Sequence, residues 1–167
     1  MIKPAIPRNE LERLASLEEA GIFNTPPEAE FDNITKLASF ICKTPVSLIS
    51  VVGETEQYFK SRYGTEICGS SREVSFCAHA ILKPKQLMVV NDTRLDERFK
   101  DNPFTLDENN PVQFYAGMPL VDHHGFALGT LCVLDNKPNK LDKEQKIALK
   151  ALAKHVEVLF ELRRKNN

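Results

Sequence analysis

The sequence contains no tryptophan, and its 167 residues include only seven glycines and four cysteines. The glycines form neither a GxGxxG nor a GxxxxGK pattern, so neither of these phosphate-binding loops is expected. The cysteines Cys42, Cys68, Cys77 and Cys132 show no CxxC spacing and are interpreted as reduced thiols. No run of about 18 apolar residues is present, and no apolar stretch of a signal peptide follows Met1. We therefore expect a cytoplasmic protein that does not bind a membrane.

An excess of charge of one sign is also absent. Lys and Arg together number 22 against 23 for Asp and Glu, which leaves a formal net charge of −1. This balance lacks the basic surface of a general nucleic-acid binder, so no nucleic-acid partner is expected. With 42% hydrophobic residues the chain is too apolar for disorder, and its length suits one domain. Without tryptophan, phenylalanine and tyrosine must form any aromatic wall of a pocket.

Two N-terminal segments have helical periodicity. The first covers 8–20, with Leu11 among its apolar positions and Gly21 as its stop signal. The second follows Thr25, which together with Glu28 predicts a capping box. The apolar face expected for this second helix consists of Phe31, Ile34, Leu37, Ala38 and Ile41.

A third helix is predicted over 142–164, beginning with a capping box between Asp142 and Gln145. Its apolar arc spans on the order of 200°, wider than packing on one sheet requires. Either the N-terminal helix covers the extra surface, or a second copy of the chain does, and we expect a homodimer. The arc consists of Leu149, Leu152, Val156, Leu159 and Phe160, flanked by Ile147, Ala151, Val158 and Leu162.

Strand signals lie between these helices. Turns at 53–54 and 122–125 join neighbouring strands as hairpins, which predicts an antiparallel sheet with the long helices on one face. A short helix is expected at 75–82, and a polar loop at 101–111 is expected to act as a lid or rim. The predicted strands cover 46–52, 57–61, 87–90, 112–121 and 126–134.

Few residues in the sequence suggest a catalytic, metal-binding or ligand-binding role. If 75–82 is helical, Cys77 and His79 point about 200° apart and do not form a thiolate–imidazole pair. They are not expected to bind a metal, because the sequence offers no second ligand pair with metal spacing. Arg72 follows a Ser70–Glu73 capping-box pattern, and either makes a surface salt bridge or faces a carboxylate or phosphate ligand. No metal site is expected.

Two further positions have a structural and a functional interpretation. Asp92 either caps a short helix anchored by Leu95 and Phe99 or contacts a ligand. Tyr115 is suited to direct its hydroxyl into a cavity, because the small residues after it allow close backbone approach. The adjacent histidines 123–124 are expected to be solvated at a hairpin tip.

Seven segments follow one another along the chain: EFDNITKLA at 30–38, PVSLIS at 45–50, FKSRYG at 59–64, REVSFCAHAI at 72–81, VNDTRLDERF at 90–99, FYAGMPL at 114–120 and LGTLCVLD at 128–135. In this order they resemble segments of one known family, the GAF domain, which is a small-molecule sensor module. The resemblance covers residues 8–162. The sequence departs from common patterns of the family at Gly53, where an acidic residue is usual, and at Tyr58, where tryptophan is frequent. The signature of cyclic-nucleotide binding and the Cys-His dipeptide that attaches bilins are both missing.

The resemblance implies an α+β fold related to PAS domains. A central antiparallel β-sheet would carry the N- and C-terminal helices on one face and a ligand pocket on the other. Residues 1–167 would form a single GAF domain, with an N-terminal helix at 8–22 and a core at 25–162 that includes the C-terminal helix. The resemblance also implies a homodimer through the terminal helices. An output domain, a histidine kinase or diguanylate cyclase, would be a partner if the chain is a fragment.

The leading hypothesis is a non-enzymatic sensor of an unidentified small molecule, with no cofactor. Two alternatives are kept. One is a thiol enzyme that uses Cys77 or Cys68, similar to GAF-fold methionine sulfoxide reductases. The other is a dimerisation module with a filled pocket. The expected ligand-binding residues are Arg72, Phe76, Cys77, His79, Asp92, Phe99 and Tyr115.

Overall fold

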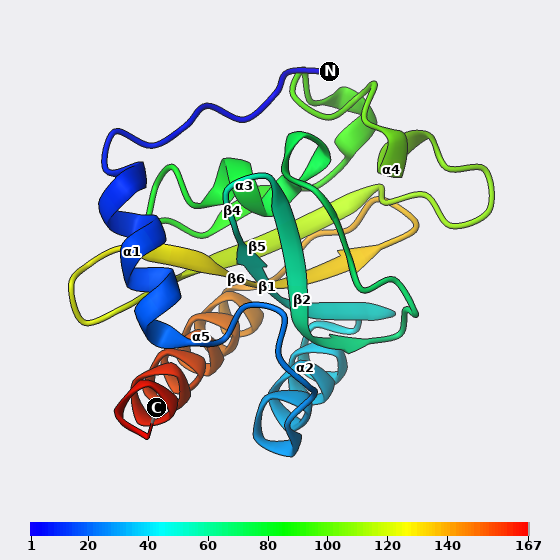
Figure 1. Cartoon of the computed structure of the whole chain (residues 1–167). Coiled ribbons are helices and arrows are strands. Elements are labelled where there is room, and N and C mark those ends of the chain that lie inside the picture. Colours follow the sequence, from blue (N-terminus) through cyan, green and yellow to red (C-terminus); the bar gives the residue numbers. More distant parts are fainter. Residues whose placement is uncertain (167) are drawn as a thin grey trace.

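The computed structural model describes residues 1–166 as an α+β fold built on a six-stranded antiparallel sheet (Figure 1). The strand order is β3-β2-β1-β6-β5-β4. Within residues 1–166, no helix combines the length and the apolar character needed to cross a membrane. In chain order the elements are α1 (Glu10–Ala20), α2 (Ala29–Cys42), β1 (Val46–Val52), β2 (Glu56–Tyr63), β3 (Gly69–Ser71), α3 (Phe76–Ala80), β4 (Met88–Val90), α4 (Pro103–Leu106), β5 (Phe114–Val121), β6 (Ala127–Asp135) and α5 (Lys143–Lys165), with 3-10 turns at Arg72–Val74 and Thr93–Leu95.

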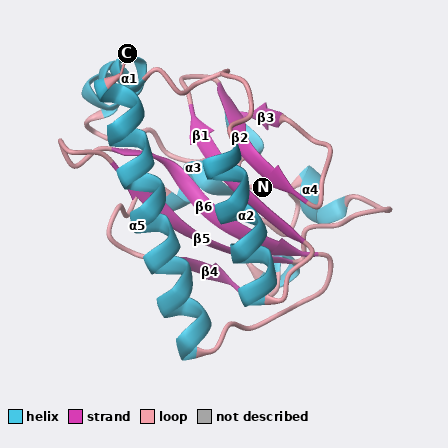
Figure 2. Cartoon of the chain, turned by 90° about the horizontal axis from the view of Figure 1, so that it is seen from below, coloured by secondary structure: helices cyan, strands magenta, loops and turns pink. Residues whose placement is uncertain are grey.

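The long helices α2 and α5 lie side by side across one face of the sheet, with α1 next to α5 (Figure 2). Strand β1 is central, because it pairs with β2 on one side and β6 on the other. Both predicted hairpins are confirmed, as are the five predicted strands and the short helix. Two elements were not predicted: the three-residue strand β3, and α4 within the expected polar loop, where the Asn102 side chain accepts from Phe104 N.

Helix α5 begins with the capping box that its sequence predicts. The Asp142 carboxylate accepts from Gln145 N at 2.8 Å, and the Gln145 side chain accepts from Asp142 N at 2.9 Å. The capping box predicted for the second helix is wrong, because α2 begins only at Ala29 with no side-chain cap. The Thr25 hydroxyl instead accepts from the Lys60 ammonium at 2.8 Å. The Glu28 carboxylate pairs with the same ammonium, so a tertiary ion pair displaces the local cap.

The apolar residues of α5 divide between core and surface. Its buried side chains are Leu149, Ala153, Val156 and Phe160, packed with residues of α1, α2 and the sheet. The flanking positions stay exposed: Ile147, Val158 and Leu162 are 57%, 55% and 53% exposed. Helix α1 therefore covers only part of the wide apolar arc.

Helices α1 and α2 bury fewer apolar positions than their sequences predict. Leu11 is 82% exposed, because the inward face of α1 carries Arg13, Ser16, Leu17 and Ala20 instead. On α2, the predicted apolar face is buried at Phe31, Ile34 and Ala38, whereas Leu37 and Ile41 face solvent.

A buried ionic cluster joins α1 to the sheet. Arg13 is 1% exposed and donates to Glu10 and to the Val52 carbonyl at 2.8 Å. Arg72 donates to the other oxygen of Glu10 at 2.7 Å and to the Gly53 carbonyl at 2.9 Å. Burial by itself raises the pKa of the Glu10 carboxyl, but the hydrogen bonds and charges of the two arginines outweigh it and hold the pKa below its usual value. One carboxylate thus compensates two buried guanidinium groups.

We expect Glu10→Gln to lower the free energy of unfolding at pH 7 by roughly 2–3 kcal/mol. This is below the ~3–5 kcal/mol of a fully broken buried pair, because Gln keeps one acceptor oxygen and Glu10 is partly exposed. A depressed carboxyl pKa stabilises the fold above the unfolded value of 4.5, and this stabilisation is lost as the pH falls through the folded value. Denaturant unfolding at several pH values should therefore show a difference that shrinks below pH 4.5. Glu12→Gln, an exposed carboxylate on the same helix, is the control, and an equal effect there would contradict this account.

Candidate functional site

A cavity of about 680 Å³ lies on the sheet face opposite α2 and α5. Its apolar wall comes from alternate residues of the strands and from α3. The loop at 64–67 and residues between 107 and 112 form its rim, so the predicted polar loop does contribute to the rim. The side chains of the wall include Leu48, Gln57, Phe59, Phe76, Cys77, Tyr115, Cys132 and Leu134.

A buried polar network holds α3 against the strands. The Ser75 hydroxyl caps α3 by accepting from Ala78 N at 3.0 Å and donates to the Gln57 side chain at 2.7 Å. Gln57 also accepts from Ser50 of β1 at 2.9 Å and donates to Ser70 of β3 at 2.7 Å. Ser70 is thus a strand residue, and the predicted Ser70–Glu73 capping box is wrong. The network fixes the start of α3 and the two residues that follow Ser75.

One of these residues, Cys77, has an unusual environment. Its sulfur lies 3.9 Å from the sulfur of Cys132 and accepts from the hydroxyls of Thr130 at 3.0 Å and Tyr115 at 3.3 Å. Burial alone raises the pKa of Cys77, but the hydrogen bonds from Cys132, Thr130 and Tyr115 outweigh it and lower the pKa to about 7. Burial and the neighbouring Cys77 raise the pKa of Cys132. The surroundings therefore shift the pKa values of the two buried thiols in opposite directions, downward for Cys77 and upward for Cys132.

The other residue, Phe76, belongs to an aromatic stack. Its ring lies 5.4 Å from that of Tyr115, nearly parallel, and 4.4 Å from that of Phe99. Gly117 makes room for this arrangement, because a Cβ there would approach the Tyr115 hydroxyl oxygen to 2.2 Å. Gly117, two positions after Tyr115, thus leaves space for the tyrosine side chain, as the small residues in this segment predicted.

Three of the seven predicted ligand residues line the cavity: Phe76, Cys77 and Tyr115. Phe99 lies behind Phe76 and is fully buried. Arg72 lies outside the lining, in the ionic cluster with Glu10.

His79 and Asp92 also lie outside the lining. The His79 ring nitrogen Nε2 is 3.0 Å from the Ile2 carbonyl oxygen. Asp92 caps the turn Thr93–Leu95, accepting from Arg94 N at 3.1 Å, which confirms its structural interpretation. The anchor predicted at Leu95 is wrong, because that side chain is 83% exposed.

Sequence reasoning missed Thr130 and Cys132 as neighbours of Cys77. Both lie on β6, and Cys132 is paired with Gly117 while Leu134 is paired with Tyr115. A usable signal existed, since residues two apart on a strand share a face. Combining the alternation of β5 and β6 with the hairpin register would have placed Cys132 beside Tyr115.

Comparison with known proteins agrees with this architecture. Residues 26–160 match the family model of the GAF domain. The chain belongs to the GAF domain family. It is 36% identical over 149 residues to a cyclic di-GMP phosphodiesterase of Pseudomonas aeruginosa, an alignment that covers 89% of this chain and 25% of that protein. The chain thus spans about a quarter of the length of this curated relative.

Solved GAF-fold structures superpose well despite low identity. The GAF domain of an Acinetobacter phosphoenolpyruvate-protein phosphotransferase matches with a TM-score of 0.68 and 12% identity, over 96% of this chain and 97% of that one. A type II free methionine-R-sulfoxide reductase of Thermoplasma acidophilum matches with a TM-score of 0.64 and 15% identity, over 79% of this chain and 90% of that one. At these identities the likeness shows a shared fold.

We expect Thr130→Val to raise the pKa of Cys77 by about one to two pH units. The substitution removes a hydroxyl that donates to the sulfur, and a hydrogen bond to a charged group is worth about 1.5–3 kcal/mol. The measurement is the ultraviolet absorbance of the thiolate against pH in a Cys68→Ser background. Cys42, whose pKa burial raises to about 11, does not interfere. A Cys77→Ser control should lose the transition, and its persistence there would contradict the assignment.

Proposed function

We propose that this GAF domain is a sensor whose cavity binds a small molecule without chemical conversion. The cavity itself carries the proposal, because its volume falls within the roughly 300–1,000 Å³ typical of ligand sites. Its wall is mainly apolar and aromatic, with a few buried polar groups such as Gln57 that would orient a ligand.

The charges around the cavity narrow the ligand class. Glu66, Asp107 and Asp135 contribute to the lining, and the described lining residues include no Lys or Arg. Acidic groups repel an anion and attract a cation. We therefore propose a neutral or cationic organic ligand. This replaces the anionic ligand that Arg72 had suggested, since that guanidinium is paired with Glu10.

Signal transfer in this proposal passes through the central strands. On β6, Cys132 lines the cavity, whereas Leu131 and Val133 pack in the helix-side core with Leu149 of α5. A ligand that shifts β6 would therefore change the packing of α5. Such a ligand changes the helix arrangement only if it binds one arrangement more tightly than the other.

We further propose that two copies pair through α5. The exposed residues Ile147, Ala151, Val158 and Leu162, here called the α5 stripe, are spaced by four, seven and four positions. At roughly 100° per residue, this spacing places the four side chains within about 60° of one another, so they form one apolar line along the helix. A second copy of the chain would present the same stripe, so the two surfaces would be self-complementary.

The ligand proposal is tested with Val112→Trp, which places a large side chain at the cavity rim. Native mass spectrometry of the protein from cell extract, together with a thermal-shift screen of metabolites, should detect a bound molecule in the parent and none in the variant. Leu106→Trp is the control, because Leu106 is exposed on α4 and outside the cavity lining. A parent protein that is always empty and gives no stabilising metabolite would contradict ligand sensing and favour the dimerisation module.

The dimer proposal is tested with Val158→Glu, which puts a charge into the α5 stripe. Analytical ultracentrifugation should show a dimer for the parent chain and at least a tenfold weaker association for the variant. Leu95→Glu is the control, because Leu95 is exposed on the turn after β4 and should leave association unchanged. A monomeric parent chain, or equal association of both variants, would contradict the proposal.

The thiol pair favours a second candidate, a reductase of a small sulfoxide. Cys77 as thiolate would attack the sulfoxide sulfur and, with one proton taken from solvent, would accept its oxygen to become a sulfenic acid while the sulfide leaves. The Cys132 thiol would then attack the Cys77 sulfur, forming a disulfide and releasing water. The two sulfurs would have to close from 3.9 Å to about 2.05 Å, and an external dithiol would reduce the bond.

An assay of methionine formation from methionine sulfoxide with a dithiol reductant distinguishes the two candidates. Turnover that Cys77→Ser abolishes and Cys68→Ser preserves would support the reductase. Absence of turnover in the parent protein would exclude it for this substrate and leave the sensor.

A further inference from the structure

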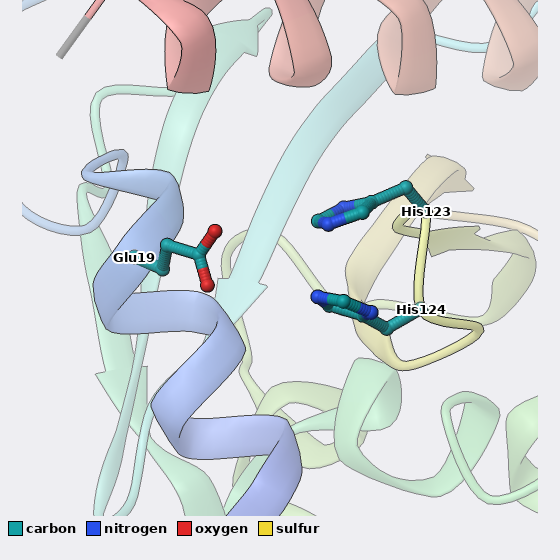
Figure 3. Close-up of side chains that lie close together, drawn as sticks. All are labelled: Glu19, His123 and His124. Atoms are coloured by element: carbon teal, nitrogen blue, oxygen red, sulfur yellow. The ribbon is translucent and has the colours of Figure 1, made fainter.

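Three potential metal ligands meet on the surface where the β5–β6 turn lies beside α1. Figure 3 shows the carboxylate of Glu19 facing the ring edges of His123 and His124. One ligand atom from each side chain lies within 4.8 Å of the others. The centroids of the two imidazole rings lie 3.7 Å apart, and the ring planes are tilted by 42°. The turn thus presents both rings to one point on α1.

The backbone that carries the histidines is held in place. The Asp122 carboxylate accepts from the backbone N–H groups of His124 and Phe126, each at 3.0 Å. The Ser16 hydroxyl of α1 donates to the same carboxylate, which ties the turn to that helix. At Gly125 the backbone has φ 89, a left-handed conformation that glycine adopts freely. The rings therefore extend from a turn fixed to α1.

A neighbouring carboxylate sets the tautomer of His123. Glu161 of α5 lies 3.0 Å from His123 Nδ1 and is held by Arg164 at 3.0 Å. A carboxylate only accepts, so Nδ1 carries the proton and Nε2 of the neutral ring has a free lone pair. Metal-binding histidines commonly have such a carboxylate partner.

We propose that Glu19, His123 and His124 form a site for a divalent transition metal of the zinc class, with Glu161 as a positioning residue. Two imidazoles and one carboxylate are a ligand set that Zn²⁺ accepts, with a fourth position left to water. Glu19 uses one oxygen for Arg164, at 3.1 Å, and keeps the other for the metal. A bound ion would link α1 to the β5–β6 turn, next to the C-terminal part of α5. The site is independent of the ligand cavity.

The test is calorimetric titration of the whole chain with ZnCl2 in a buffer that does not chelate metals. The parent protein should bind one equivalent, and Glu19→Gln, His123→Asn and His124→Asn should each weaken binding at least tenfold. His155→Asn is the control, because His155 is exposed on α5 outside the cluster and should leave binding unchanged. Glu161→Ala should weaken binding by about 10–100-fold, and Glu161→Gln, which keeps an acceptor oxygen, should restore part of the affinity.

Cobalt substitution is the second measurement, because it identifies the ligand atoms. Bound Co²⁺ should give visible absorption bands of nitrogen and oxygen coordination that His123→Asn removes. A thiolate-to-cobalt charge-transfer band, lost in Cys68→Ser, would assign binding to a cysteine and overturn the proposal. The absence of saturable Zn²⁺ binding, or binding that the double variant His123→Asn, His124→Asn retains, would also overturn it.

Discussion

The antiparallel pairing of β1 with β6 at the centre of the sheet determines what each face of this protein can do. Along both strands successive side chains alternate between the helix layer and the cavity: Ile49 and Leu131 face the helices, while Leu48 and Cys132 face the cavity. A slip of one residue would exchange these sets. Gly129 supports the observed register, since a Cβ there would meet the Ser50 carbonyl oxygen at 1.8 Å. The separation of a structural face from a binding face thus depends on this one pairing.

Buried charged and amide side chains hold the segments whose positions the strand pairing does not determine. Lys60 on β2 is buried and binds Glu28 and Thr25, which places the chain ahead of α2. Gln57 on the same strand joins α3 to β1 and β3. Such groups are costly to bury unless their hydrogen bonds are satisfied. Because each of these groups must meet its hydrogen-bond partners, the helices are held in one position. Apolar contacts alone specify such a position less well.

Much of the fold could be predicted from the sequence, because its signals are local. The alternation of apolar residues, the turn residues of both hairpins and the capping box at Asp142 all act within a few positions. The errors occurred where a distant partner competes with a local signal. Thr25 binds Lys60 instead of capping a helix, and Arg13 occupies the inward face of α1 that periodicity assigned to leucines.

The candidate site was harder to predict for the same reason. Tyr115 was singled out by the small residues that follow it, and Phe76 and Cys77 lie in a segment that carries the family resemblance. The other neighbours of Cys77, Thr130 and Cys132, come from a strand more than 50 residues later. The histidines of the β5–β6 turn were expected to be solvated, and their meeting with Glu19 depends on how α1 docks. A sequence pattern carries little information about such contacts, since they arise only when separate elements pack.

The ionic cluster also has a consequence for where the domain can be divided. The family match covers residues 26–160 and so excludes α1, yet that helix supplies Glu10 to the buried Arg72. A shortened protein that began at residue 26 would leave this guanidinium without its carboxylate and uncover the apolar contacts of Leu17 and Ala20. The smallest unit that folds stably is therefore larger than the region that matches the family model, and α1 is an integral part of it.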